Sequence, residues 1–248
     1  MNSQLAKRFG LLGVFFFLAI RAEAETGDEL FKSGLDAARA GQFPQAAKAF
    51  NDSLARQPAA GTLLNLGIVD WRCGRVGEAI VSWERAAWLN PFDADARNNL
   101  AFARQAAQLD PPELAWPEWL STWLPARVWG WLACGSLWLA LALVILPGVL
   151  RARKAGWQQT LAALACGVFI LSLPPNLGVI TRTNLGIVLE KDTVLRLTPT
   201  QEGEVVATLS AGEAARKLRE RGGFFLIRTA RGSGWVERRQ FELLSPAR

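Results

Sequence analysis

Few residues in this 248-residue chain have the types and spacing that catalysis or metal binding requires. The sequence contains no histidine, so it offers no histidine base and no histidine metal ligand. Cys73, Cys134 and Cys166 fit no metal-binding or redox spacing, and we interpret them as small buried hydrophobic residues. No glycine-rich phosphate loop follows a predicted strand, the acidic residues form no convergent pair, and no nucleophile has an activating partner. We therefore expect a protein without a catalytic role, a metal or a cofactor.

Four basic residues lie in the stretch RKLRERGG, residues 216–223. Because side chains alternate between the two faces of a strand, Lys217, Arg219 and Arg221 are expected to share one side. A cationic strip of this kind would contact an anionic surface, either lipid headgroups or cell-wall polymers. The alternative interpretation is that the charges protect an edge strand from pairing with other chains.

The excess of basic residues is spread unevenly along the chain. The net charge is +6, but residues 25–110 carry nine basic and eleven acidic side chains, whereas residues 182–248 carry twelve and eight. A nucleic-acid interface needs more basic residues on one face, with aromatic residues nearby. We therefore expect no nucleic-acid partner.

The elements that would position these side chains begin with an internal repeat of period 33. GLDAARAGQFPQAAKAFNDSLARQP (34–58) aligns without a gap to GIVDWRCGRVGEAIVSWERAAWLNP (67–91). Matched Gly and Ala let antiparallel helices approach closely, an aromatic fills the space between repeats, and Pro ends the second helix. The pattern resembles the tetratricopeptide repeat (TPR), except at Ser53, where that family usually has Ala. The resemblance implies an all-α TPR domain over residues 25–110, with two repeats and a capping helix at 93–108.

The resemblance to TPR proteins also implies a concave groove that binds peptides. Polar side chains on the first helix of each repeat line that groove in the family, and the corresponding residues are Lys32, Asn65 and Asn99. Arg39 and Arg72 lie one to two turns further along their helices. An Asn in such a groove can hydrogen-bond the backbone of an extended peptide, whereas a solvated helix face is the alternative for each residue.

The N-terminus has the pattern of a secretory signal peptide. Lys7 and Arg8 precede a 12-residue apolar run, and an A-x-A site ends at Ala24. Twelve residues are too few to span a bilayer as a helix. We expect cleavage of residues 1–24, with an uncleaved anchor as the alternative; either way, the following chain is exported.

Two apolar stretches predict transmembrane helices over residues 127–150 and 160–180. Pro174, Pro175 and Asn176 interrupt the second stretch, although a lone span would leave that stretch exposed to water. The stretch RARKAG lies in the connecting loop, residues 151–159, and cytoplasmic loops are enriched in Lys and Arg. We therefore expect a cytoplasmic basic loop, with the segments before and after the two helices outside the cell membrane.

Tryptophans crowd the outer end of the first predicted span. Residues 111–126 form a Trp-rich segment containing PEWLSTWL, and indole rings favour the headgroup level of a membrane. The segment is expected to lie flat on the membrane surface; a lid over the preceding helices is the alternative.

The C-terminal part, residues 181–248, has the period of a β protein. Short apolar runs are separated by glycine-containing turns, which predicts five or six strands in a small barrel. The runs LRLTP, LSAG and GSGWV resemble a bacterial SH3-like domain. In that family the Trp of the last run, here Trp235, packs on the barrel; contact with a ligand is the alternative.

The order of these parts is similar to that of BatE-type membrane proteins of the Bacteroides aerotolerance operon. DADARNNLAFAR after the repeats, followed by the Trp-rich segment, also resembles that family. The resemblance implies a multi-pass protein of the bacterial inner membrane, with both folded domains on the periplasmic side. It implies association with membrane proteins bearing von Willebrand factor A domains and with a MoxR-type AAA+ ATPase, in aerotolerance or envelope assembly.

Two functions follow as hypotheses. In the first, the protein is a non-catalytic scaffold that holds a protein partner in the TPR groove beside other membrane components. In the second, it is a cell-wall sensor or tether whose SH3-like domain binds peptidoglycan. Membrane lipid is a contact in both.

Overall fold

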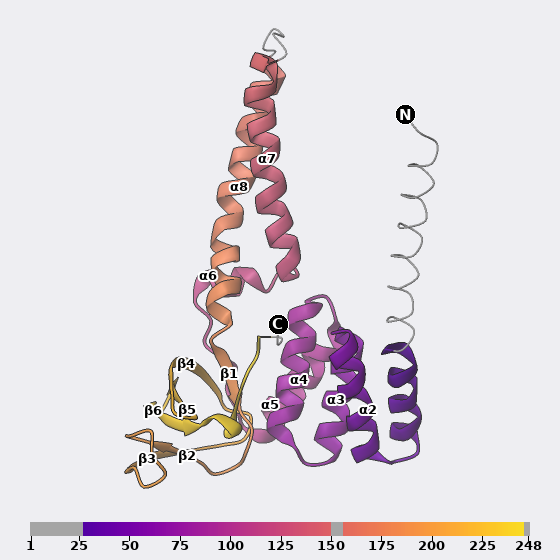
Figure 1. The fold of residues 1–248 in the computed structure, drawn as a ribbon, viewed down its shortest axis with the longest axis vertical. Coiled ribbons are helices and arrows are strands. Elements are labelled where there is room, and N and C mark those ends of the chain that lie inside the picture. Colours follow the sequence, from indigo (N-terminus) through magenta and orange to yellow (C-terminus); the bar gives the residue numbers. More distant parts are fainter. Residues whose placement is uncertain (1–26, 150–155, 246–248) are drawn as a thin grey trace, which may run out of the picture.

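The computed structural model describes residues 27–149 and 156–245. The predicted signal peptide (1–24) and the basic stretch 151–155 lie outside the described residues. The described chain is mostly helical, and it ends in an antiparallel sheet of seven strands. In Figure 1 the helical stack and the sheet lie side by side, and a long helical hairpin projects from them.

The helical stack consists of antiparallel helices joined by short turns. Residues 27–39 form the first described helix. It is followed by α2 (Phe43–Arg56), α3 (Ala60–Arg72), α4 (Val76–Leu89) and α5 (Ala94–Ala107). The carboxylate of Asp93 caps the N-terminus of α5 by accepting hydrogen bonds from the N–H groups of Asp95 and Ala96.

The aromatic and glycine positions of the repeat meet as the sequence predicts. A Cβ on Gly34 would lie 2.5 Å from the ring of Phe50, and a Cβ on Gly67 would lie 2.5 Å from the indole of Trp83. Each aromatic ring therefore packs directly against the backbone of the preceding helix, where only glycine leaves room. Ser53 is buried, and its hydroxyl donates to the carbonyl of Gly27 at 3.0 Å, so the hydroxyl has a partner inside the first helix pair.

Two helices are long and apolar enough to cross a membrane: α7 (Ala126–Val149) and α8 (Gly156–Arg182). Only 6% of the apolar window of α7 is buried inside the structure, which is unlike a core helix of a soluble protein. The second helix begins four residues before the predicted span, and its two prolines do not interrupt it. The side-chain amide of Asn176 donates to the carbonyl of Trp129 at 3.0 Å and so joins α8 to α7.

Cysteine positions in the hairpin differ from the expectation. Cys134 and Cys166 are exposed on α7 and α8, and Cys73 is only half-buried. The interpretation as buried residues was wrong because the hairpin turns most of its apolar surface outward.

The sheet has strand order β3-β2-β6-β5-β4-β1-β7, and all its described pairs are antiparallel. Seven strands replace the five or six expected, and Trp235 is half-buried on β6. Val188, Leu195, Ile227 and Val236 are among the residues of the sheet's own core. The strands are β1 (Leu185–Val188), β2 (Thr193–Arg196), β3 (Val205–Leu209), β4 (Ala214–Arg221), β5 (Phe224–Thr229), β6 (Gly232–Glu237) and β7 (Phe241–Leu243).

The helical stack and the sheet share one hydrophobic core. Ile80 and Trp83 of α4 pack in the same cluster as Ile187 of β1 and Leu244. At Gly77 the backbone of α4 approaches the sheet so closely that a Cβ would lie 2.4 Å from the carbonyl oxygen of Leu189. The two parts are therefore held together by close packing rather than by a flexible linker.

Polar contacts reinforce this interface. The guanidinium of Arg85 on α4 donates to the carbonyl of Leu243 at 2.8 Å and pairs with Glu242 at 2.7 Å. Helix α8 also runs almost directly into the sheet, because only Thr183 and Asn184 separate it from β1, and the carbonyl of Asn184 accepts from the N–H of Lys217.

Candidate functional site

One face of α3 carries two of the polar residues predicted for peptide binding. Asn65, Ile68 and Arg72 are spaced by three and four residues and therefore lie along one side of the helix. Ile68 is 40% exposed, and Arg72 is exposed. The side-chain amide of Asn65 donates to the carbonyl of Gly61 at 2.8 Å, and the oxygen of the same side chain can serve as an acceptor.

Helix α5 extends this face. Phe102 is 57% exposed, and its ring meets the indole of Trp71 edge-on at 5.6 Å between centroids. Asn99 lies one turn before Phe102 on the same side of α5. Trp71 and Phe102 thus join α3 to α5, and three of the predicted residues lie on these two helices beside three apolar ones. We define the α3–α5 face as Asn65, Ile68, Trp71, Arg72, Asn99 and Phe102.

Lys32 and Arg39 lie on the first described helix, residues 27–39, which is the helix of the stack furthest from the sheet in Figure 1. Lys32 lines a shallow pocket between the first helix and α2, together with Gln42 and Gln45. Arg39 is exposed and forms an ion pair with Asp36 at 3.2 Å. This pocket contains none of the α3–α5 residues, so the five predicted groove residues do not line one common pocket here.

The predicted cationic strip on β4 is interrupted. Lys217 pairs with Ile227, whereas Arg219 pairs with Leu226, so Leu218 is an extra residue in a β-bulge. Adjacent residues of β5 point to opposite faces, and Lys217 is therefore on the face opposite to Arg219 and Arg221. The ammonium of Lys217 lies 4.9 Å from the ring centroid of the buried Phe225. The expectation of three cations on one side was wrong, because the bulge reverses the alternation.

A buried ion pair joins the sheet to the foot of the hairpin. Helix α6 (Trp116–Ser121) packs on α8, where a Cβ on Gly178 would lie 2.0 Å from the carbonyl oxygen of Pro117. Glu118 on α6 is 1% exposed, and both of its carboxylate oxygens accept hydrogen bonds from Arg216 of β4, each at 2.7 Å. The N–H of Ala115 donates to the same carboxylate at 3.0 Å.

The electrostatics of this pair favour the charged state. Burial by itself raises the pKa of the Glu118 carboxyl, but hydrogen bonds from Arg216, Thr181 and the Ala115 N–H outweigh burial and hold that pKa below its usual range. The same contact raises the pKa of Arg216. Glu118 is therefore ionised at neutral pH although it is buried.

The Trp-rich segment packs at the foot of the hairpin, and its expected position on the membrane surface stays a prediction. Helix α6 packs against α8 rather than over the helical stack, so the lid does not describe it. Trp116, Trp119 and Trp123 are exposed around this helix, and Trp119 and Trp123 stack edge-on at 4.9 Å.

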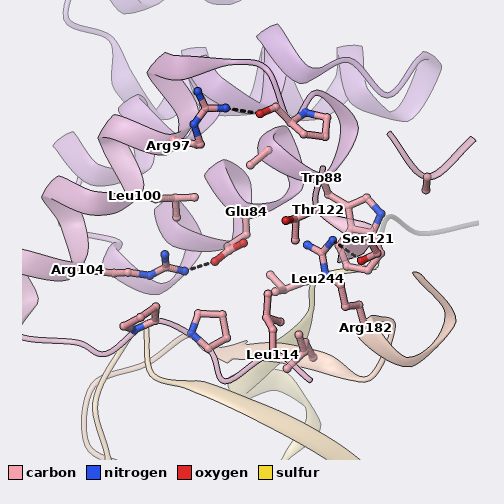
Figure 2. Close-up of a pocket in the computed structure, with 16 residues that line it drawn as sticks. Glu84, Trp88, Arg97, Leu100, Arg104, Leu114, Ser121, Thr122, Arg182 and Leu244 are labelled. Atoms are coloured by element: carbon pink, nitrogen blue, oxygen red, sulfur yellow. Dashed lines mark hydrogen bonds and ion pairs between the residues drawn. The ribbon is translucent and has the colours of Figure 1, made fainter. Parts of the chain in front are cut away.

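A cavity of about 260 Å³ lies where the helical stack, the hairpin foot and the sheet meet (Figure 2). Its apolar wall includes Trp88, Leu100 and Leu114. The charged residues that line it are Glu84, Arg97, Arg104 and Arg182. We call it the junction cavity.

Arg182, the last residue of α8, points into the junction cavity (Figure 2). Its guanidinium carbon lies 4.2 Å from the ring centroid of Trp88, and Nη1 donates to the hydroxyl of Ser121 at 3.3 Å. The residue is 8% exposed, and its Nε is buried without a hydrogen-bond partner among the described residues. Arg104 pairs with Glu84, and Arg97 donates to the carbonyl of Pro91.

Sequence reasoning missed Glu118, Arg216 as its partner, and Arg182. Glu118 and Arg216 are 98 residues apart, and their pairing leaves no local pattern. A weak signal existed, because Glu118 is the one charge within PEWLSTWL and Arg182 ends the second apolar stretch.

Among the described residues, no group of three or more His, Cys, Asp or Glu side chains is placed to hold a metal ion. Comparison with protein-family models and with curated proteins found no match to this chain.

Proposed function

We propose that the protein is a non-catalytic, membrane-anchored adaptor of the bacterial envelope that binds an extended segment of a partner protein on the α3–α5 face. The observation that carries this proposal is a pair of exposed apolar side chains, Ile68 and Phe102. Ile68 lies one turn before Trp71 on α3, and the ring of Phe102 contacts the indole of Trp71. Exposed aromatic and aliphatic groups of this kind are favoured at the centre of protein interfaces, with polar groups at the rim.

The polar residues of the face suit a peptide backbone. The carbonyl oxygen of Asn65 can accept an N–H from an extended partner, because its amide already donates to Gly61. Arg72 is exposed, and we assign it to an acidic side chain or a C-terminal carboxylate of the partner. The resemblance to TPR proteins supports the same surface, since peptides bind the first helices of the repeats in that family.

Membrane placement completes the proposal. Helices α7 and α8 would cross the inner membrane, the basic stretch at 151–154 would stay in the cytoplasm, and the helical stack and SH3-like sheet would face the periplasm. By the resemblance to BatE-type proteins, the first partners to test are membrane proteins with von Willebrand factor A domains and the MoxR-type ATPase system.

The adaptor is tested by affinity purification of the full chain from membranes in mild detergent. Phe102→Ala should reduce the yield of co-purified partner by at least about tenfold, as expected for a central interface residue, and Asn65→Ala should reduce it less. Phe92→Ala is the matched control, because Phe92 is exposed to a similar degree (66%) but lies in the turn before α5.

Equal partner yields from the wild type, Phe102→Ala and Phe92→Ala would overturn the proposal. Unfolding is excluded as a cause by comparing the melting temperatures of the variants. Because Phe102 is largely exposed, its truncation should cost little stability.

The cell-wall tether remains a second candidate because Arg219 and Arg221 are exposed on the outer face of β4. Deleting residues 190–248 would not test it cleanly, since the sheet shares its core with α4. The double substitution Arg219→Gln/Arg221→Gln is better, because it leaves that core intact. Loss of salt-sensitive binding to isolated cell wall, with partner yield unchanged, would favour the tether over the adaptor.

A further inference from the structure

We propose that the junction cavity binds the phosphodiester head group of an anionic phospholipid, with Arg182 as the principal ligand. This inference rests on the proposed membrane placement of α7 and α8. The argument begins with the charge of Arg182.

Arg182 carries a buried positive charge that no described carboxylate contacts. It is more than nine-tenths buried, its Nε lacks a partner, and its one described hydrogen bond goes to the neutral hydroxyl of Ser121. Glu84, the acidic residue of the cavity, is engaged by Arg104. Glu84 and Glu118 attract Arg182 only through space, without a direct contact, so burial of this charge is still costly, and an anion in the cavity would lower that cost.

The residues that line the junction cavity favour a ligand that has both an anionic group and an apolar part. Three arginines and one glutamate line the junction cavity, so its charged side chains sum to a positive net charge. Trp88 covers one face of the Arg182 guanidinium, which leaves the edge of that group for a planar or tetrahedral oxyanion. Phosphate matches these donors well.

The position of the cavity identifies the source of the phosphate. Arg182 ends α8, and Ala126, which begins α7, also lines the cavity. The exposed Trp116, Trp119 and Trp123 surround the neighbouring α6, and indole rings favour the headgroup level. Basic pockets between transmembrane helices on the cytoplasmic or matrix side bind anionic head groups, and the same chemistry would act here at the periplasmic leaflet.

The size of the cavity agrees with a head group and excludes a whole lipid. Its volume, about 260 Å³, lies below the ~300–1,000 Å³ of pockets that enclose drug-sized ligands. The acyl chains would therefore remain in the bilayer beside the hairpin.

The test is native mass spectrometry of the full chain released from detergent micelles that contain equal amounts of an anionic and a zwitterionic phospholipid. The wild type should retain anionic lipid, and Arg182→Gln should lower that retention by at least about tenfold, since a charged hydrogen-bond donor is lost. Arg127→Gln is the matched control: Arg127 is exposed at the start of α7 and does not line the cavity, so retention should be unchanged.

A second measurement covers the case in which Arg182→Gln fails to fold. The melting temperature of the wild type is measured with short-chain phosphatidylglycerol, short-chain phosphatidylcholine or inorganic phosphate. A rise with phosphatidylglycerol alone supports the proposal, and Arg182→Lys should show a smaller rise because Lys cannot bind phosphate in a bidentate manner.

Equal rises with both lipids, or no rise with either, would overturn the proposal. An equal rise with inorganic phosphate would overturn the assignment to lipid and assign the cavity to a soluble anion. Failure of the adaptor proposal appears separately, as unchanged partner yield, and failure of membrane insertion appears as protein in the soluble fraction.

Discussion

Replacing Arg216 with methionine should loosen the sheet from the hairpin foot. The substitution removes two hydrogen bonds of 2.7 Å from the buried carboxylate of Glu118 and leaves only the Ala115 N–H and Thr181 near it. A hydrogen bond to a charged group contributes roughly 1.5–3 kcal/mol, and breaking one side of a buried ion pair costs about 3–5 kcal/mol. Because the side chain of Arg216 is itself 29% exposed, we expect the lower end, about 3 kcal/mol.

Hydrogen exchange of the full chain in detergent measures this loss locally. A loss of about 3 kcal/mol corresponds to opening of β1 and β4 on the order of 100-fold more often. Arg239→Met is the matched control, because Arg239 makes an ion pair of the same length, 2.7 Å to Glu237, but is 73% exposed. Its loss should cost less than about 1 kcal/mol. Equal protection of β4 in the two variants would refute the reasoning.

Acid provides a second check on the same pair. The folded pKa of Glu118 lies below its usual value, so its stabilising contribution is present above the unfolded pKa of about 4.3 and is lost as the pH falls through the folded pKa. Because Arg216 is the main partner that lowers this pKa, the stability difference between the wild type and Arg216→Met should be largest at neutral pH and shrink as acid protonates the carboxyl in both proteins. A difference that does not change with pH would mean that the carboxylate charge is not responsible.

Two further predictions concern packing and topology. Gly77→Ala should lower the melting temperature, at a cost of roughly 1–3 kcal/mol in stability, because the new methyl group would meet the backbone of Leu189. Gly61→Ala is the control and should be neutral or stabilising, because its methyl group would meet nothing within 4 Å. Equal effects of the two substitutions would contradict close packing of α4 on the sheet. Alkaline phosphatase fused after the last residue should be active, whereas a fluorescent GFP at the same position would place the C-terminus in the cytoplasm and overturn the proposed sidedness.

The helical stack could be predicted because its determinants repeat in the sequence. Gly34 and Gly67 occur 33 residues apart, each followed 16 residues later by the aromatic that packs on it, and this spacing is visible without a structure. The two apolar helices were predictable for a similar reason, since length and absence of charge are local properties. Helix α8 begins before the predicted span at residue 160, because the polar residues Gln158 and Gln159 belong to its first turns.

The arrangement of the parts could not be predicted, because it depends on single long-range contacts. Nothing in the sequence near Arg216 indicates Glu118 as its partner, and nothing near Gly77 indicates Leu189. The bulge at Leu218 depends on how β4 pairs with β5, so simple alternation placed Lys217 on the wrong face. Three of the predicted binding residues lie on α3 and α5, and these helices meet through Trp71 and Phe102. The sequence prediction missed these two aromatic residues because it considered polar groups alone.

The two-residue connection between α8 and β1 has a mechanical consequence. Thr183 and Asn184 span at most about 7 Å and are hydrogen-bonded at both ends, so the hairpin and the sheet cannot move independently of each other at this connection. A pull exerted on the α3–α5 face would pass through the shared core to β1, which is joined to α8 by this short connection. In the proposed membrane placement, the sheet and the helical stack would therefore follow any change in the tilt of α8 together.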